Sequence, residues 1–195
     1  MANTLRLAMI NCRGINNKLG EIKHLLYKNA LDILCVSETK ITRFEPKFVN
    51  YSTIWKHRDF RMGGGLGIII HRNIQHQEME IPPYRGGKLE YIAFKFFSVD
   101  GQAISLLSIY NPNERVTVQE FQYYIGQLGT TYVILGDFNA HTVKLDTNTP
   151  RTNFAGRSLD ALLEQEDVCL INPVNFYTYL SPATGKKSCL DLCLS

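Results

Sequence analysis

The chain alternates short apolar runs with segments of helical period along its whole length, and this alternation restricts the fold more than any other feature. Leu5 to Ile10 is typical of a strand, Asn16 to Asn29 of an amphipathic helix, and Leu31 to Ser37 of a buried strand. No long linker, repeat or low-complexity stretch interrupts the pattern. We therefore expect one α/β layered domain covering residues 1–195.

The remaining pattern favours strands in the middle of the chain and a mixture of helices and strands after it. Helices are predicted at Val116 to Leu128 and Gly156 to Glu166. Strands are predicted at Gly65 to His71, Glu90 to Phe97, Gln102 to Tyr110, Thr131 to Leu135, Val168 to Ile171, Phe176 to Leu180 and Ser188 to Leu194. Gly63 to Gly65 reads as a turn into a strand, and the predicted hairpins favour mixed sheets.

Composition excludes several other classes of protein. With 45% hydrophobic and 20% charged residues the chain is an ordinary globular sequence, neither disordered nor fibrous. We see no apolar run that predicts a membrane span or a secretion signal. The five cysteines form no C-x-x-C pair, so we expect reduced, mostly buried cysteines without disulfide partners, as in an intracellular protein.

The formal net charge of +3 is unevenly distributed. Residues 1–72 hold 12 Lys or Arg against 5 Asp or Glu, whereas residues 73–195 hold 9 against 13. A nucleic-acid enzyme would show this division if its cations gripped phosphates and its carboxylates held a metal. Ordinary solvated surface explains it equally well.

Several polar residues stand where apolar strands end, which is where α/β folds commonly build sites. Each alone reads as a turn former or a helix cap. Together they provide three carboxylates, two amides and a phenol: Asn11, Glu38, Tyr110, Asp137, Asn139 and Asp191. Oxygen ligands of this kind suit Mg²⁺, and the set predicts hydrolysis of a phosphate ester.

Seven short motifs occur in an order that is specific as a set: Asn11-Cys12-Arg13-Gly14, Ser37-Glu38-Thr39-Lys40, Arg61-Met62-Gly63-Gly64-Gly65, Tyr110-Asn111-Pro112, Gly136-Asp137-Phe138-Asn139-Ala140-His141, Tyr177-Thr178 and Ser188-Cys189-Leu190-Asp191. By these motifs the chain resembles the apurinic-type endonuclease domain of non-LTR (LINE-type) retrotransposons, within the exonuclease-endonuclease-phosphatase superfamily. The resemblance implies a four-layer α/β/β/α sandwich with mixed sheets.

The resemblance also implies roles for the polar residues. Glu38 is the principal Mg²⁺ ligand with Asn11 beside it, and Mn²⁺ is an alternative metal. Asp137 is the acid/base that activates or orients the attacking water, and Asn139 orients that water. Tyr110 supports the scissile phosphate.

Four further residues are expected to face DNA: Thr178, by the same resemblance, and also Arg13, Lys40 and His141. Arg13 stands where repair relatives carry an acidic residue of the metal site, which implies weaker metal affinity. The segment Lys40 to Arg61 interleaves cations with aromatic residues. It is either a DNA-gripping surface or, as we favour, a loop and strand with its aromatics packed inward.

Asp191 matches an aspartate that orients a histidine in the family's last motif, and that histidine is absent from the sequence. We therefore expect a domain truncated before its last strand, which nicks DNA poorly with Mg²⁺ and not at all in EDTA.

The predicted function is a Mg²⁺-dependent endonuclease that nicks double-stranded target DNA in the nucleus, leaving a 3′-hydroxyl for primed reverse transcription by a downstream reverse-transcriptase domain. The alternatives are a catalytically impaired copy that at most binds DNA, and a superfamily relative acting as an abasic-site nuclease or a phosphatase.

Overall fold

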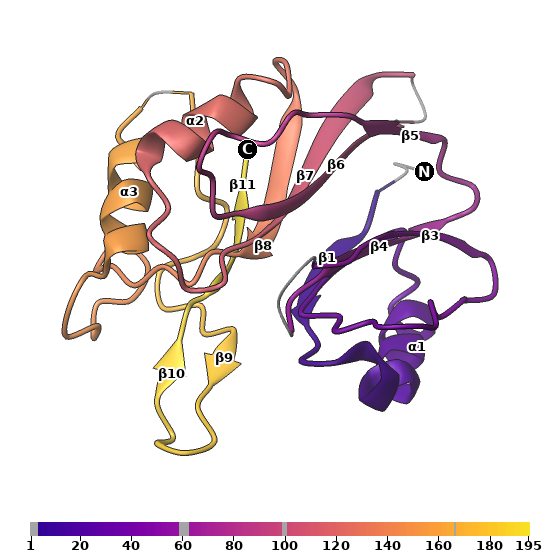
Figure 1. The fold of residues 1–195 in the computed structure, drawn as a ribbon, viewed down its shortest axis with the longest axis horizontal. Coiled ribbons are helices and arrows are strands. Elements are labelled where there is room, and N and C mark those ends of the chain that lie inside the picture. The colour runs from indigo at the N-terminus through magenta and orange to yellow at the C-terminus, as the bar shows by residue number, and fades with distance from the viewer. Residues whose placement is uncertain (1–3, 59–62, 99–100, 166) are drawn as a thin grey trace.

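Two β-sheets pack against each other and carry helices on their outer faces (Figure 1). The structure is a computed structural model, and it describes residues 4–58, 63–98, 101–165 and 167–195. The helices are the 3₁₀ helix η1 (Ile15–Lys18), α1 (Leu19–Lys28), α2 (Val118–Ile125) and α3 (Phe154–Leu163). The strands are β1 (Leu7–Asn11), β2 (Ile33–Ser37), β3 (Tyr51–Lys56), β4 (Leu66–His71), β5 (His76–Met79), β6 (Glu90–Phe97), β7 (Ala103–Tyr110), β8 (Tyr132–Asp137), β9 (Tyr179–Leu180), β10 (Lys187–Ser188) and β11 (Asp191–Leu194).

Both large sheets are mixed, as predicted. The first has the order β1-β2-β4-β3, in which β1 and β2 are parallel and the other pairs antiparallel. The second has the order β11-β8-β7-β6-β5, in which β7 and β8 are parallel and the other pairs antiparallel. β9 and β10 form a separate two-stranded hairpin at the bottom of Figure 1.

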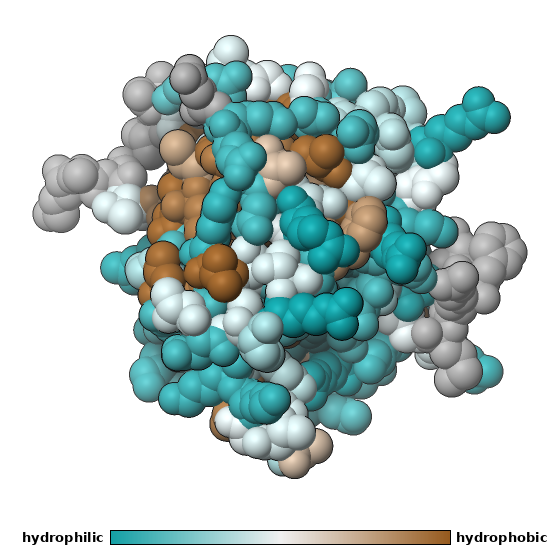
Figure 2. Space-filling model, turned by 90° about the vertical axis from the view of Figure 1, so that its left-hand side faces the viewer, coloured by the Kyte–Doolittle hydropathy of each residue, from teal (hydrophilic) through white to brown (hydrophobic). Residues whose placement is uncertain are grey.

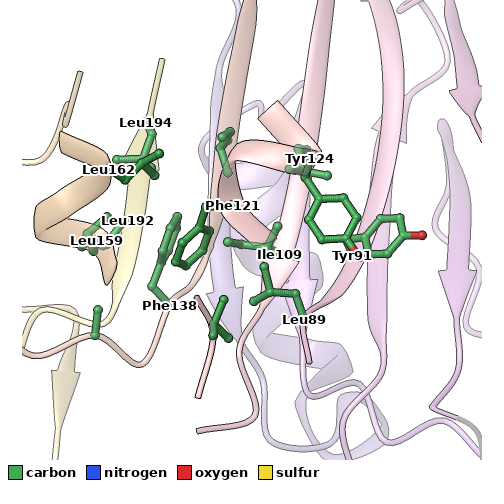
Figure 3. Close-up of a cluster of buried hydrophobic side chains, with 14 of the residues drawn as sticks. Leu89, Tyr91, Ile109, Phe121, Tyr124, Phe138, Leu159, Leu162, Leu192 and Leu194 are labelled. Atoms are coloured by element: carbon green, nitrogen blue, oxygen red, sulfur yellow. The ribbon is translucent and has the colours of Figure 1, made fainter. Parts of the chain in front are cut away.

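Three layers of buried side chains separate four layers of backbone. Between the sheets, residues such as Ile68 and Phe94 from facing strands form one core. On the outside of the first sheet, Ile22 of α1 packs on Leu34 of β2. On the outside of the second sheet, Figure 3 shows side chains of α2 and α3 gathered with those of β7 and β11. The predicted four-layer α/β/β/α sandwich is therefore confirmed.

Side-chain caps fix where the two later helices begin. The Thr117 hydroxyl accepts a hydrogen bond from the backbone N–H of Glu120 at 3.3 Å, and α2 starts at the next residue after the cap. The Asn153 side chain caps α3 in the same way through Gly156 N–H at 2.7 Å. Such caps satisfy backbone donors that have no partner inside the helix.

Some predicted elements differ from the structure. The segment Val168 to Ile171 is not a strand, and Leu170 makes only an isolated bridge to Leu194. Of the predicted strand Phe176 to Leu180, only Tyr179–Leu180 pairs. The predicted features at Phe60, Arg61, Met62 and Glu166 lie outside the described residues. Conversely, the sequence pattern did not predict β5, whereas β3 is the strand that was expected, without bounds, within Lys40 to Arg61.

Residues 171–180 explain why that part of the prediction was wrong, because much of their apolar surface is exposed. The exposed side chains there are Ile171, Val174, Phe176, Tyr177 and Leu180. The side of the molecule that carries α3 is otherwise largely hydrophilic, with hydrophobic residues gathered in one part of it (Figure 2). A short apolar run therefore does not by itself indicate a buried strand.

The cysteines follow the expectation that most of them are reduced and buried. All five are free, and Cys12, Cys35 and Cys189 are buried. Cys193 is half-buried and Cys169 is exposed, so most of the cysteines are buried, as expected. Within the described residues, no helix combines the length and the apolar character needed to cross a membrane.

Candidate active site

The predicted site residues lie where strands of the two sheets end side by side. Asn11 is the last residue of β1, and Glu38 directly follows β2, its parallel neighbour. In the second sheet Tyr110 ends β7, Asp137 ends β8 and Asp191 begins β11. The register pairs Asp137 with Tyr110 on one side and with Asp191 on the other. The sheet pairing thus aligns these three residues in one row.

The amide of Asn11 joins the two sheets. Its Nδ2 donates to Glu38 Oε1 and to Asp137 Oδ2, in both cases at 2.9 Å. The Tyr110 hydroxyl donates to the same Glu38 oxygen at 3.2 Å, and Lys40 Nζ lies 3.2 Å from Glu38 Oε2. The two carboxylates predicted for metal binding and for acid/base work are therefore held within one hydrogen-bond network.

An unusual backbone conformation presents Glu38 to this network. Both Glu38 and Lys40 have positive φ angles, of 51° and 50°. Hydrogen bonds hold the loop, since Thr39 N–H donates to Gly65 O at 3.1 Å and Lys40 N–H donates to Gly64 O at 2.9 Å. A Cβ on Gly65 would lie 2.7 Å from Thr39 Oγ1, at a φ of 85°. The glycine turn, as predicted, leads into a strand, and it also fixes the Glu38 loop.

Asn139 and Asp137 form a tight turn after β8. The Asn139 N–H donates to Asp137 Oδ1 at 3.0 Å, and the Asn139 side chain donates to the carbonyl oxygen of Asn111 at 2.7 Å. Asn111 is fully buried and its amide donates in turn to Phe138 O at 3.0 Å. The sequence did not predict that Asn111 supports the Asn139 turn, although Asn111 belongs to the Tyr110-Asn111-Pro112 motif and could have been found from it.

The carboxyl groups differ in their proton affinity. Burial raises the pKa of Asp137 to about 6, against hydrogen bonds from Asn11 and from the Asn139 backbone that lower it. Burial and the neighbouring Asp137 raise the pKa of Asp191 to about 7. Burial would also raise the pKa of Glu38, but hydrogen bonds from Asn11 and Lys40 outweigh it, so that this pKa lies below its usual range. Such divergence between neighbouring carboxyls is common in catalytic sites.

A cavity of about 430 Å³ opens over these residues, and it has the DNA-facing candidates Arg13, His141 and Thr178 in its lining. Arg13 stacks on Tyr179 of the hairpin, with its Cζ 4.9 Å from the ring centroid. Thr178 Oγ1 accepts hydrogen bonds from the backbone N–H groups of Leu190 and Asp191, which anchors the start of β11. Burial lowers the pKa of His141 below its usual value.

A larger cavity of about 790 Å³ adjoins this one through His141 and Ser188. Its lining includes the cations Arg151, Lys186 and Lys187. Of the aromatic residues in the segment Lys40 to Arg61, Phe48 and Tyr51 are buried and are therefore not available to contact DNA, whereas Phe44 is exposed. For Phe48 and Tyr51 the expectation of inward packing is confirmed.

No three His, Cys, Asp or Glu side chains gather as a metal cluster within the described part of the chain. Glu38 with the Asn11 amide is a smaller donor set, with the Glu38 side chain 19% exposed at the cavity. Mg²⁺ is commonly held by one or two carboxylates and keeps several waters. The donors present therefore fit Mg²⁺ better than a metal that needs a complete protein cage.

Comparison with solved structures identifies the class of fold. The endonuclease domain of TRAS1, a telomere-specific non-LTR retrotransposon, matches with a TM-score of 0.75 and 13% identity, over 98% of this chain and 84% of that one. The catalytic domain of Xenopus laevis APE2 matches with a TM-score of 0.66 and 17% identity, over 96% and 81%. The fold is that of the exonuclease-endonuclease-phosphatase superfamily.

Sequence comparison narrows this class. Residues 104–195 match the family model described as endonuclease-reverse transcriptase. A probable RNA-directed DNA polymerase from transposon BS of Drosophila melanogaster is 24% identical over 98% of this chain, which spans 21% of that protein's length. The resemblance to the endonuclease domain of non-LTR retrotransposons is thereby confirmed.

Proposed function

We propose that the chain is a Mg²⁺-dependent DNA endonuclease domain of a non-LTR retrotransposon. It nicks one strand of double-stranded target DNA in the nucleus and leaves a 3′-hydroxyl for reverse transcription by a domain of the same polyprotein. The observation that carries the proposal is the Asn11 amide, which donates both to Glu38 and to Asp137, a residue 126 positions away in the sequence. A merely structural turn would not need two carboxylates of separate sheets at one cavity.

In this proposal Glu38 and the side-chain oxygen of Asn11 hold the metal ion. Mg²⁺ would neutralise charge on the phosphoryl oxygens and on the leaving oxygen. In the structure Lys40 Nζ, 3.2 Å from Glu38 Oε2, supplies the positive charge nearest to that carboxylate. The Glu38 pKa below its usual range keeps the carboxylate ionised and ready to bind a cation at neutral pH.

Asp137 is proposed as the general base. With a pKa of about 6 it is mostly ionised at pH 7, and its pKa is close enough to that pH for it to accept a proton efficiently. It takes a proton from water as the water oxygen bonds to phosphorus, and the P–O3′ bond breaks. The 3′ oxygen leaves with the electron pair of that bond, takes a proton from solvent and becomes the hydroxyl. Asn139, tied to Asp137 and Asn111, would hold the water in line with phosphorus.

The remaining residues are proposed to bind DNA. Tyr110 would support the scissile phosphate beside Glu38. Arg13 and Lys40 would meet phosphates, since sequence-independent affinity for DNA comes mainly from such cations. Thr178 and His141 line the same cavity and would contact the strand that enters it. Asp191, in register with Asp137, would keep a second carboxyl group beside the base.

The test is the nicking of supercoiled plasmid by the purified chain with Mg²⁺ and with EDTA. We expect slow nicking with Mg²⁺, none with EDTA, and loss of activity in Asp137→Ala. Extension of the nick by a DNA polymerase would identify the 3′-hydroxyl. Lys144→Gln is the matched control, because Lys144 pairs with Glu164 at an exposed site away from the cavity.

Other outcomes would favour the alternatives. Nicking that persists in EDTA would contradict the metal-dependent mechanism. DNA binding without Mg²⁺-dependent nicking would favour an impaired copy. Cleavage restricted to abasic DNA, or release of phosphate from small esters, would favour the two other superfamily activities.

A further inference from the structure

One acidic residue continues the row of site residues across the second sheet but was not predicted from the sequence. The register aligns Asp191 with Asp137, Asp137 with Tyr110, and Tyr110 with Glu90 at the start of β6. Residues that face one another across neighbouring strands point to the same side of a sheet. Glu90 therefore stands on the side of Tyr110 opposite to Asp137.

Glu90 is engaged with Arg58, which follows β3 in the other sheet. Arg58 Nε donates to Glu90 Oε1, and Arg58 Nη2 forms an ion pair with the same oxygen. The two side chains are only 18% and 20% exposed. An ion pair withdrawn from water to this degree is costly to break on one side only, because the other charge is then left without a partner.

Two routes lead from this pair to Glu38. The guanidinium of Arg58 lies over the ring of Tyr110, at 5.7 Å from its centroid, and the Tyr110 hydroxyl donates to Glu38 Oε1. Through its other oxygen, Glu90 accepts from Gly65 N–H at 2.7 Å, and Gly65 is part of the turn that holds the Glu38 loop.

The backbone beside Arg58 is shaped to admit its side chain. A Cβ on Gly64 would come within 2.2 Å of the Arg58 guanidinium carbon. Gly64 also has a φ of 66°, which favours glycine, and its carbonyl oxygen accepts from Lys40 N–H. The same turn therefore makes room for Arg58 and fixes the loop that carries Glu38.

We propose that Arg58 and Glu90 are positioning residues that hold Tyr110 and the Glu38 loop in the geometry needed to bind the metal ion and the scissile phosphate. The inference rests on the proposed function, because it assigns these residues to the same site. Neither residue lines the cavity over Glu38 and Asp137, so the pair would act through Tyr110 and Gly65.

The first experiment compares Arg58→Gln, Arg58→Lys and Glu90→Gln with the parent chain. We expect kcat for nicking a duplex oligonucleotide to fall 10- to 100-fold in Arg58→Gln and Glu90→Gln, with a similar loss of Mn²⁺ affinity measured by electron paramagnetic resonance, as is typical when residues that orient metal ligands are replaced. KM for DNA should change little. Arg58→Lys should recover part of the loss, since lysine keeps the charge but not the planar stack.

Arg157→Gln is the matched control. Arg157 lies over the ring of Phe154 at 5.7 Å, like Arg58 over Tyr110, but on an exposed surface of α3. We expect its kcat and Mn²⁺ affinity to stay at the parent values. A lower melting temperature in Arg58→Gln with unchanged kcat and Mn²⁺ affinity per folded molecule would mean that the pair only joins the sheets, and would overturn the proposal.

A double-mutant cycle tests the route through Tyr110. Because Tyr110→Phe already removes the hydroxyl that reaches Glu38, adding Arg58→Gln should lower kcat by less than it does in the parent chain. If Arg58→Gln lowers kcat by the same factor in the Tyr110→Phe background as in the parent chain, Arg58 does not act through the Tyr110 hydroxyl.

A third measurement does not depend on activity. The ring signal of Tyr110 in ¹³C-tyrosine-labelled protein, assigned by its loss in Tyr110→Phe, should shift in Arg58→Gln and not in Arg157→Gln. An unshifted signal would overturn the positioning role. If the parent chain fails to nick DNA, the proposed function fails, while this signal still decides the role of Arg58.

Discussion

Replacing Asp191 by Asn should stabilise the fold, and by more at high pH than at low pH. Asp191 lies directly across from Asp137 in the β11–β8 pair, and its Oδ1 is buried without a hydrogen-bond partner among the described residues. Burial and the facing carboxylate raise its pKa to about 7. Between about pH 4 and pH 7, the folded chain therefore keeps a proton on Asp191 that the unfolded chain has already released.

The sign and the size of the effect follow from proton linkage. A carboxyl group with a raised folded-state pKa destabilises the fold progressively as pH rises from about 4 to about 7, and by a constant amount above that. Taking pKa values of about 7 when folded and about 3.9 when unfolded, the cost is about 4 kcal/mol at pH 8 and about 1.5 kcal/mol at pH 5. Asp191→Asn removes this cost. The gain in stability should therefore be about 3 kcal/mol larger at pH 8 than at pH 5, whatever the amide itself costs.

The assay is urea denaturation of the parent and the variant, followed by circular dichroism at both pH values. For a chain of this size, 1 kcal/mol also corresponds to a melting shift of about 2–4 °C. Glu164→Gln is the control, since this glutamate is exposed at 71% and should give a small change that is the same at both pH values. An equal effect of Asp191→Asn at pH 5 and pH 8, or a loss of stability at pH 8, would refute the reasoning.

Three further predictions concern the site and the sheet beneath it. Glu38→Gln should lower Mg²⁺-dependent nicking at least about 100-fold, and plasmid assays over a range of Mg²⁺ concentrations would show it; retained activity would remove Glu38 from the metal site. Since the pKa of Asp137 is about 6, kcat should fall about tenfold per pH unit below pH 6 and level off above it. A flat profile from pH 5 to 8 would exclude Asp137 as the base. Gly136→Ala should cost about 1–3 kcal/mol or more in urea denaturation, because the new Cβ would lie 2.2 Å from Ile109 O. A decrease in the free energy of unfolding below about 0.5 kcal/mol would contradict this prediction, because it would mean that β7 and β8 move apart at little cost.

The strands that were predicted well are those with buried residues along most of their length. β2 and β4 are almost wholly buried, and both lie within the predicted ranges. β5 was not predicted and β3 was expected only as a strand without bounds, because their residues are mostly half-buried or exposed and show no apolar run. The pattern of a sequence reports burial, so a strand at the edge of a sheet leaves a weaker signal than a central one.

The candidate site shows a similar division. Strand ends and motif order were enough to select Glu38 and Asp137, and the structure brings both to one network. The roles of Asn111 and Glu90 could not be found in this way. Their side chains bind backbone groups and a cation that become neighbours only once the register of the strands is set.

The division of the site between two sheets has a consequence for the synthesis of the protein. Asn11 and Glu38 leave the ribosome well before Asp137, which lies on the other sheet. Under the proposed function, a growing chain that has formed only its first sheet would hold the proposed metal ligands without the proposed base, and it would not cut nucleic acid. Under the proposed function, the catalytic site would therefore be complete only once the second sheet has formed and packed against the first.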